Sequence, residues 1–236
     1  MSAPPQAGNI AVVIPARNEA DRIQATVTAA SGLPGVGLVV VVDDGSRDGT
    51  GAIARRAGAV VLRHVRNRGK AAALQSGANA VGVVDQRERR DSPRHLLFLD
   101  ADLAESAAQA GPLADPVLAG KADMTIAVFA STVKLGGHGL VVGLSGAGIR
   151  RAVGWRPAQP LNGQRCLTRA AFEAARPLAR GWGVETALTI DLLRQGFRVT
   201  EVEVELAHRA TGTGLRAQLH RAHQLTDVAR TLAARL

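Results

Sequence analysis

The chain has 236 residues, of which 46% are hydrophobic and 21% charged, a composition typical of a globular domain with a core of its own. Its formal net charge of +9 fits either a solvated Arg-rich surface or an anionic partner, and no basic motif interleaved with aromatic residues suggests a nucleic acid. A single cysteine, Cys166, excludes an intrachain disulfide. Because the sequence also lacks a signal-peptide pattern and any apolar run near the roughly 20 residues that span a bilayer, we expect a soluble, cytoplasmic protein.

Strands and helices are predicted to alternate over the first hundred residues. Four apolar segments predict strands, at residues 10–14, 38–42, 59–63 and 95–99. Three segments between them predict helices, at residues 19–30, 53–57 and 69–80. This alternation predicts an α/β fold with a mostly parallel central sheet flanked by helices, whose ligands bind at the carboxyl ends of the strands. The charged residues 85–94 predict a solvent-exposed loop.

The pattern is less regular in the second half of the chain. Four further elements are predicted there, strands at residues 124–130 and 198–206 and helices at residues 172–179 and 184–195. The Gly-rich residues 136–148 predict a flexible loop. Residues 215–236 predict a basic amphipathic helix, which allows a peripheral contact with an anionic membrane.

Two carboxylates follow the strand predicted at residues 95–99. Asp100 and Asp102 lie on either side of Ala101. Carboxylate oxygens are preferred ligands of Mg²⁺ and Mn²⁺, and a metal held there can contact a diphosphate and neutralise a leaving group. The structural alternative is that Asp102 caps a following helix while Asp100 is solvated. We expect the metal site, because three other polar clusters fall on the same edge of the sheet.

These three clusters each follow a predicted strand. They are Pro15, Ala16, Arg17 and Glu19 after the first strand, Asp43 and Asp44 after the second, and Lys70 at the start of a helix after the third. Carboxylates can accept hydrogen bonds from a base or ribose, and a lysine at a helix N-terminus attracts phosphate. The alternative is that the clusters only cap turns and helices. No GxxxxGK[ST] motif precedes Lys70, which argues against a P-loop NTPase.

Glu185 and His208 are the polar candidates of the second half. Glu185 begins a predicted helix, where a carboxylate is favourable for structural reasons alone. His208 follows a predicted strand and is either a surface histidine or a metal ligand. Spacing alone favours the structural interpretation of both.

Four motifs in order, VIPARNE, VVDDGSRDGT, RNRGKAAAL and FLDADL, resemble the donor-site motifs of family-2-like glycosyltransferases of the GT-A fold, including the dolichyl-phosphate mannosyltransferases. The resemblance implies a single domain over residues 1–236, with a Rossmann-like nucleotide-sugar-binding half at 10–102, an acceptor half at 103–214 and a C-terminal helix at 215–236. It implies a Mg²⁺ or Mn²⁺ cofactor and a homodimer. The implied donor-binding residues are Pro15, Ala16, Arg17, Glu19, Asp43, Asp44, Lys70, Asp100, Ala101, Leu161, Asn162 and Glu185.

The motifs PLNG, GWGVET and AHR carry a narrower resemblance, to glucosyl-3-phosphoglycerate synthases. It implies that Asp102 and His208 hold the metal together with Asp100, and that Glu185 contacts the donor sugar. Trp182 stands where that family has Tyr, and Asn162 where it has Gly. No Gly-Arg-x-Thr pattern for phosphoglycerate occurs around residues 136–144, so the acceptor and the stereochemistry stay open.

The expected function is therefore metal-dependent transfer of a sugar from a nucleotide-diphosphate sugar, with UDP-glucose as the first candidate and Asp102 and Glu185 as catalytic residues. The expected acceptor is a small phosphorylated molecule. One alternative is a polyprenyl-phosphate glycosyltransferase that uses GDP-mannose or UDP-glucose, and another is a catalytically silent nucleotide-sugar-binding protein. A nucleotidyltransferase would need a Gly-rich loop near the N-terminus, which the sequence lacks. A membrane-associated module would rest on residues 215–236 alone.

Overall fold

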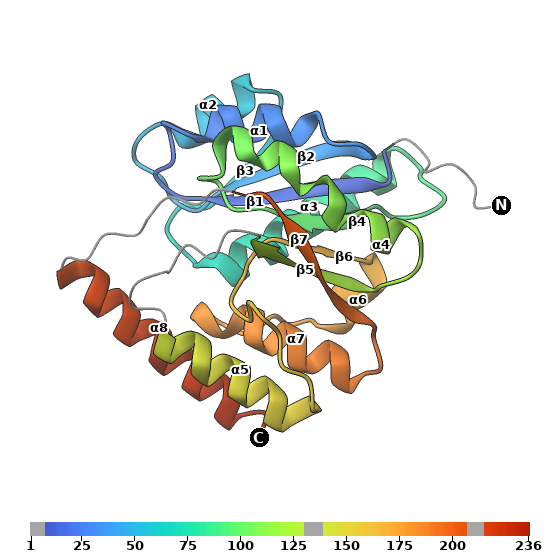
Figure 1. The fold of residues 1–236 in the computed structure, drawn as a ribbon. Coiled ribbons are helices and arrows are strands. Elements are labelled where there is room, and N and C mark those ends of the chain that lie inside the picture. The colour runs from blue at the N-terminus through green and yellow to red at the C-terminus, as the bar shows by residue number, and fades with distance from the viewer. Residues whose placement is uncertain (1–7, 130–138, 207–214) are drawn as a thin grey trace.

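The computed structural model describes residues 8–129, 139–206 and 215–236, with side chains of the last segment described from residue 223 onward. The described strands form one sheet in the order β3-β2-β1-β4-β6-β5-β7 (Figure 1). They are β1 (Ile10–Ala16), β2 (Val36–Asp43), β3 (Val60–Arg63), β4 (His95–Phe98), β5 (Met124–Phe129), β6 (Arg165–Leu167) and β7 (Val199–Val204).

The sheet is mostly parallel, as the sequence predicts. Strands β3, β2, β1 and β4 run parallel, with Val13 of β1 paired to Val40 on one side and to Phe98 on the other. β6 is antiparallel to both β4 and β5, and β7 is parallel to β5. The valines at 40–42 are fully buried, which fits a central strand covered on both faces.

Helices cover both faces of the sheet (Figure 1). One face is covered by α1 (Ile23–Ser31), α2 (Thr50–Arg56), the 3₁₀ segment η1 (Ala104–Leu113) and α4 (Asp115–Leu118), and the other by α3 (Lys70–Arg87), α6 (Arg169–Ala174) and α7 (Val184–Arg194). Val12 packs into the first apolar core and Val13 into the second, because neighbouring residues of a strand point to opposite faces. A short 3₁₀ turn, η2 (Gly181–Gly183), precedes α7.

A third layer lies against the outer side of α7. It consists of α5 (Gly139–Val153) and α8 (Leu215–Ala233), which run side by side in Figure 1. A small core joins the three helices, with Ile149 of α5, Ile190 of α7, and Val228 and Leu232 of α8 among its members. None of the helices in the described ranges is long and apolar enough to cross a bilayer.

The prediction of a flexible loop at residues 136–148 is wrong from residue 139 onward, where α5 begins. Glycine lowers intrinsic helix propensity, but packing against α8 compensates for it. A Cβ atom at Gly148 would lie 2.3 Å from a methyl carbon of Leu232, so the absence of a side chain is what lets the two helices approach. Residues 136–138 lie outside the described residues.

The prediction of a charged loop at residues 85–94 is also wrong in part, because α3 continues to Arg87. Asp85 and Arg94 are buried and form an ion pair, and the backbone N–H of Arg94 donates to Asp85 Oδ2 over 3.0 Å. Their opposite charges pair in the folded chain, so neither charge needs solvent. The helix predicted at 172–179 instead spans Arg169–Ala174, because Pro177 follows closely and cannot extend it.

His95, at the start of β4, is expected to make the fold sensitive to acid. Burial, and after it the nearby Arg169 cation, lowers the pKa of His95. The imidazole of His95 therefore binds a proton more readily in the unfolded chain than in the folded one. The contribution of neutral His95 to stability is complete above about pH 6.5 and is lost as the pH falls below that value. Urea unfolding between pH 7.5 and 5 should show a smaller loss of free energy in H95N than in the wild type. Equal losses would contradict this role.

Candidate functional site

The loops after β1 and β2 are joined at the carboxyl edge of the sheet. The backbone N–H of Asp44 donates to the carbonyl oxygen of Ala16 over 2.8 Å. The N–H of Asn18 donates to Ser46 Oγ over 3.0 Å, and the N–H of Glu19 donates to Thr50 Oγ1 over 2.9 Å. The structure thus brings the clusters at residues 15–19 and 43–50 together at one edge.

Asp43 and Asp44 are directed into the protein. They are only 3% and 5% exposed, respectively. Asp43 Oδ1 accepts the N–H of Ser46 over 2.8 Å. The Asp44 carboxylate accepts the backbone N–H groups of Arg68 and Gly69, each over 2.8 Å, and lies 2.7 Å from His64 Nδ1. In this structure both aspartates hold loops in place, and Asp44 fixes the segment that leads into Lys70.

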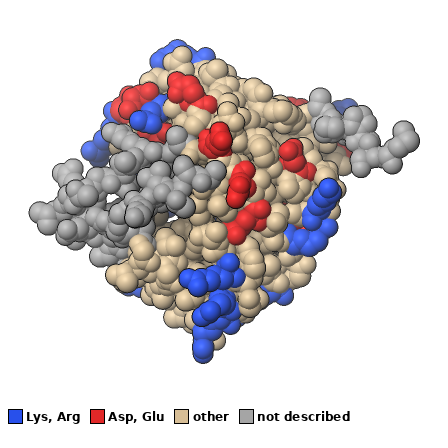
Figure 2. All heavy atoms as spheres, in the orientation of Figure 1, with Lys and Arg blue, Asp and Glu red and all other residues tan. Residues whose placement is uncertain are grey.

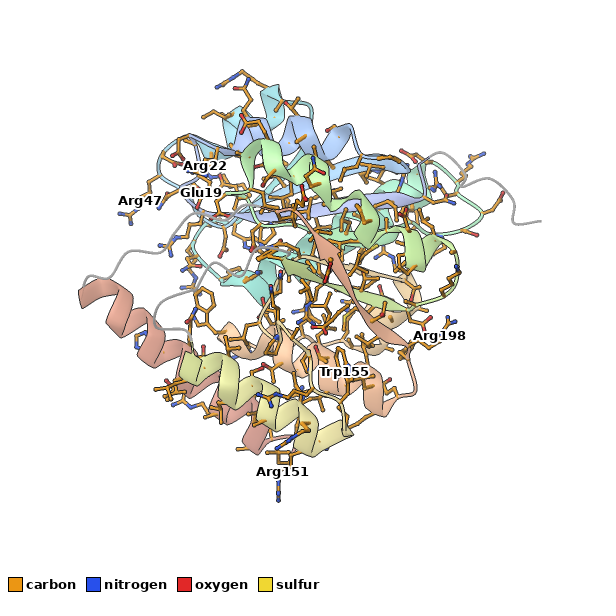
Figure 3. The ribbon with its side chains drawn as sticks, in the orientation of Figure 1. Glu19, Arg22, Arg47, Arg151, Trp155 and Arg198 are labelled. Carbon is orange, nitrogen blue, oxygen red and sulfur yellow. The ribbon has the colours of Figure 1, made fainter. Side chains whose placement is uncertain are left out.

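A cavity of about 400 Å³ opens beside these aspartates. It is lined by Arg17, Gly45, Ser46, Arg47, Arg63, Val65, Arg66 and Asn67. Figure 3 shows Arg47 at the same end of the sheet as Glu19 and Arg22. Four arginines therefore surround a space next to the ends of β1, β2 and β3, which suits an anionic ligand.

Lys70 connects the two halves of the chain. Its Nζ lies 2.8 Å from Asp100 Oδ1 and 3.2 Å from Glu185 Oε1. Burial alone would lower the pKa of Lys70, but the negative charges of Asp100 and Glu185 outweigh it and raise the pKa above its usual range. The amine is therefore a fixed positive charge between two carboxylates that the sequence predicts as donor-binding residues.

Gln164 holds the other side of Asp100 and was missed in the sequence. Its Oε1 accepts the backbone N–H of Asp100 over 2.8 Å, and its Nε2 donates to Asp100 Oδ2 over 2.7 Å. A Cβ atom on the neighbouring Gly163 would lie 2.2 Å from Lys70 Nζ, so any side chain there would have to displace the amine. Gln164 and Lys70 together fix the orientation of the Asp100 carboxylate.

The 101–104 turn that contains Asp102 is held by α1. Thr26 Oγ1 donates to the Ala101 carbonyl and accepts the N–H of Ala104, each over 2.8 Å. Arg22 Nη1 donates to the Asp102 carbonyl over 3.2 Å. The following 3₁₀ segment has Leu103 at its cap position and no side-chain cap hydrogen bond. The turn is therefore held through the main-chain atoms of Ala101, Asp102 and Ala104.

Asn162 and Leu161 lie in the turn that precedes β6. Asn162 is buried, its Nδ2 donates to the Ala127 carbonyl over 2.9 Å, and its Oδ1 accepts the N–H of Gln164 over 2.9 Å. Leu161 is partly buried against the core shared by α5, α7 and α8. These contacts place Asn162 behind Gln164, where it supports the turn.

Arg165 is the largest fully buried side chain of the described residues. Its guanidinium donates to the carbonyl oxygens of Pro160, Asn162 and Glu185 over 3.0, 2.8 and 3.1 Å. Burial lowers the pKa of Arg165 to about 10. An arginine in a three-residue strand carries no sequence signal for burial, so this link between the 160–162 turn and the start of α7 was missed.

Replacing Arg165 by leucine is expected to lower the free energy of unfolding by about 3–5 kcal/mol, because several buried carbonyl groups lose their donor. Urea denaturation would measure the change. R165K should recover only part of it, since an ammonium cannot reproduce the planar fork. R198A, which removes a largely exposed arginine paired with Asp123, is the control and should have a much smaller effect. A stable R165L would contradict the role given to this residue.

His208 lies outside the described residues, so the structure does not place the third predicted metal ligand. In the described ranges, no group of three or more His, Cys, Asp or Glu side chains is arranged to hold a metal ion. The structure brings together Lys70, Asp100 and Glu185, and it places Asp102 two residues from Asp100 on the same turn.

The model of glycosyl transferase family 2 matches residues 11–139, more than half of the chain. The chain belongs to this family. The match includes β1 to β4 and the loops at their carboxyl ends.

Two curated relatives are similar over part of their length. An uncharacterised protein of Methanocaldococcus jannaschii is 35% identical over 117 residues, which cover 50% of this chain and 45% of the relative. Glycosyltransferase AglJ of Haloferax volcanii is 27% identical over 209 residues, which cover 86% of this chain and 65% of the relative. The chain thus spans less than two thirds of the length of either.

Solved structures of glucosyl-3-phosphoglycerate synthase from Mycobacterium tuberculosis share the fold. The complex with Mn²⁺, UDP and phosphoglyceric acid has a TM-score of 0.76 at 26% identity and covers 97% of this chain and 78% of that one. The complex with Mg²⁺ and UDP has a TM-score of 0.74 at 26% identity and covers 97% and 79%. The GT-A fold that the motifs predicted is confirmed.

Proposed function

We propose that the chain is a metal-dependent glycosyltransferase whose donor is a nucleotide-diphosphate sugar, with UDP-glucose as the first candidate. The observation that carries the proposal is the position of Lys70 Nζ, within 2.8 Å of Asp100 and 3.2 Å of Glu185. The Lys70 ammonium thereby joins Asp100, which follows β4 in the donor half, to Glu185 in the acceptor half. The family membership and the UDP-glucose bound by a similar structure support this assignment.

The donor would lie along the carboxyl edge of the sheet. The base and ribose would lie next to the loop at residues 15–19, and the diphosphate would extend past the arginine-lined cavity toward Lys70. Asp43 and Asp44, being buried, would shape this site through the loops they hold rather than by direct contact.

The proposed metal ligands suit a hard divalent cation. The carboxylates of Asp100 and Asp102 supply the oxygen ligands that Mg²⁺ and Mn²⁺ prefer, and His208 would complete the set. A bound metal ion supplies charge neutralisation on the departing diphosphate. Lys70 adds a fixed positive charge beside it, and Gln164 keeps the Asp100 carboxylate in one orientation. Glu185 would hold donor-sugar hydroxyls or, in an inverting reaction, take the acceptor proton.

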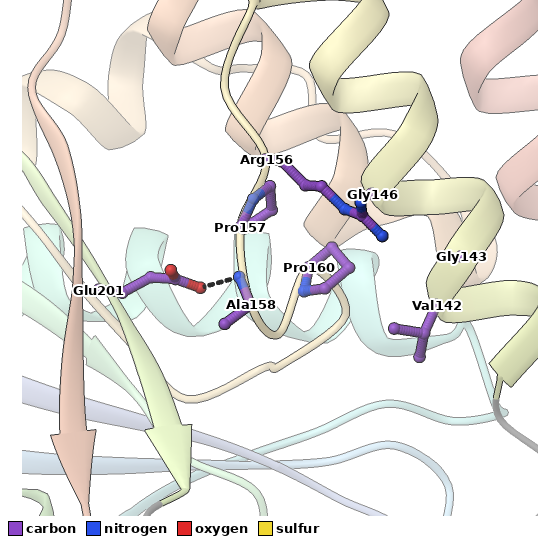
Figure 4. Close-up of a pocket in the computed structure, with 8 residues that line it drawn as sticks. All are labelled: Val142, Gly143, Gly146, Arg156, Pro157, Ala158, Pro160 and Glu201. Carbon is purple, nitrogen blue, oxygen red and sulfur yellow. Dashed lines mark hydrogen bonds between the residues drawn. The ribbon is translucent and has the colours of Figure 1, made fainter.

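The acceptor is proposed to be an anionic molecule. A second cavity, of about 330 Å³, lies between α5 and the 156–160 loop and is lined in part by Arg156, Pro160 and Gly143 (Figure 4). Glu201 Oε1 accepts the N–H of Ala158 over 2.7 Å and fixes this loop. Arg156 offers the cavity a positive charge and Glu201 a negative one, so the preference for an anion rests on the net charge of +9 of the chain.

A polyprenyl-phosphate acceptor is the second candidate, supported by the surface of α5. Leu140, near the start of this helix, is 82% exposed, and Arg150 and Arg151 are in its last turn. Figure 2 shows basic side chains gathered at the end of the molecule where Figure 3 places Arg151. An apolar and a basic part on one helix suit a peripheral contact with an anionic membrane.

A thermal-shift screen of UDP- and GDP-sugars, each with Mn²⁺ and with chelator, tests the proposal. A ligand that binds only the native state raises the midpoint of unfolding. We expect one donor to raise the midpoint only when the metal is present, followed by turnover with phosphorylated or lipid-phosphate acceptors. Binding without turnover would favour the silent binding protein, and no shift with any donor would overturn the proposed function.

A further inference from the structure

Helix α8 packs against the short turn that precedes Glu185. In Figure 1 it lies beside α5 and α7, on the side of α7 away from the sheet. Val228 and Leu232 of α8 are buried with Ile190 of α7. Tertiary packing thus ties α8 to the helix that begins one residue before Glu185.

Side chains of α8 fill the space that a side chain at position 181 or 183 of the turn would occupy. A Cβ atom at Gly181 would lie 2.1 Å from Asp227 Oδ2, and one at Gly183 would lie 2.0 Å from Thr231 Oγ1. Gly181 also has a φ of +68°, a conformation that favours glycine. The glycines of the GWGVE motif are therefore explained by a helix that contacts them directly.

Asp227 makes a hydrogen bond to this turn. Its Oδ2 accepts the backbone N–H of Trp182 over 3.1 Å. The Asp227 carboxylate therefore contacts two neighbouring residues of the turn, by a hydrogen bond to Trp182 and by close packing against Gly181.

The opposite end of α7 is attached to the residues that follow α8. Arg235 donates through Nε and Nη2 to the two carboxylate oxygens of Asp191, each over 2.7 Å. A two-point contact of this kind fixes orientation as well as distance. With both ends of α7 held, the Glu185 carboxylate has a defined position, 3.2 Å from Lys70 Nζ.

We propose that Asp227 is a positioning residue for Glu185, acting through the 181–183 turn, an inference that rests on the proposed role of Glu185 at the donor. Asp227 does not touch the donor. It holds the backbone from which Glu185 reaches Lys70. The Glu185 carboxylate is then already in position when the donor sugar binds. The same contact gives α8 a part in the reaction although the helix contributes no group to the reacting atoms.

The test compares D227A with D227N. Alanine removes the acceptor of the Trp182 N–H, whereas the asparagine Oδ1 can still accept it. We expect D227A to weaken donor use, measured as kcat/KM for the nucleotide sugar, by about 10- to 100-fold, the range that follows from a misplacement of about 1 Å. D227N should recover most of the loss. R230A, which replaces an exposed residue of the same helix, should leave kcat/KM unchanged. D227A with wild-type kcat/KM, or D227N as poor as D227A, would overturn the inference.

A double-mutant cycle separates positioning from general loss of stability. The dissociation constant of the donor is measured by calorimetry for D227A, E185Q and the double variant, with urea unfolding as a check on the fold. If Asp227 acts through Glu185, D227A weakens donor binding much less in the E185Q background than in the wild type. Equal effects in the two backgrounds would contradict the inference. Failure of the wild-type protein to bind any nucleotide sugar would instead reject the proposed function.

Discussion

Replacing Asp102 by alanine is expected to lower sugar transfer by about 10³-fold while the fold is kept. The proposed metal contributes several kcal/mol of charge stabilisation to the departing diphosphate, and about 4 kcal/mol corresponds to that factor. The backbone of the turn should survive, because the side chains of Thr26 and Arg22 hold its main-chain atoms. Initial rates with the donor identified by the thermal-shift screen, with Mn²⁺ present, would measure the effect.

The control for this experiment is another aspartate of the same chain. Asp91 is exposed and lies at the opposite end of β4 from the site, so D91A should retain full activity. D102A should also lose the Mn²⁺-dependent part of the thermal shift, and urea unfolding without ligand checks that the fold is kept. Normal turnover in D102A would remove the basis for the metal site.

Local sequence patterns were sufficient for the donor half of the fold. The strands β1 to β4 and the helices α1 to α3 were all predicted, because each has a hydrophobic period of its own and its ends carry turn or cap residues. α3 was predicted too short, since the pairing of Asp85 with Arg94 depends on a partner that pattern analysis does not see. Whether a charged side chain such as Asp85 is buried depends on the partner that the tertiary structure brings to it.

The chemistry of the site stays a prediction, and its internal connections could not be predicted from the sequence. Asp100 and Lys70 were identified from motifs, and the structure adds the contacts that join them. Gln164 and Arg165 lie in or beside β6, a strand of three residues that is too short to show a period. Both act on neighbours far away in the sequence, Gln164 on Asp100 and Arg165 on the start of α7. Such contacts appear only after the chain folds.

Replacing Lys70 by methionine is expected to lower kcat/KM for the nucleotide sugar by about 10²-fold or more, because the donor loses a fixed positive charge and two carboxylates are left facing each other. Asp100 and Glu185 both contact this amine. Methionine keeps the length of the side chain, so the change is mainly one of charge.

The pH dependence of this loss has a defined sign. The pKa of Lys70 is raised above its usual range by Asp100 and Glu185, against the opposing effect of burial. A base with a raised pKa in the folded state contributes its full stabilisation below its unfolded pKa, about 10.4, and loses it only at higher pH. The ratio of wild-type to K70M activity should therefore be constant from pH 6 to 9. A ratio that falls steeply within this range would show that Lys70 loses its proton there.

Arginine is not expected to rescue the site, and the reason is Gly163. A Cβ atom at that glycine would already lie 2.2 Å from Lys70 Nζ, so the space around the amine is closed on that side. The guanidinium of K70R would be bulkier than the ammonium and would have to displace either the 162–164 turn or the Asp100 carboxylate, which Gln164 holds. K70R should then be nearly as impaired as K70M although its charge is preserved. Full activity in K70R would mean that positive charge alone is needed at this point, and that the close fit of Gly163 to Lys70 has no part in the function.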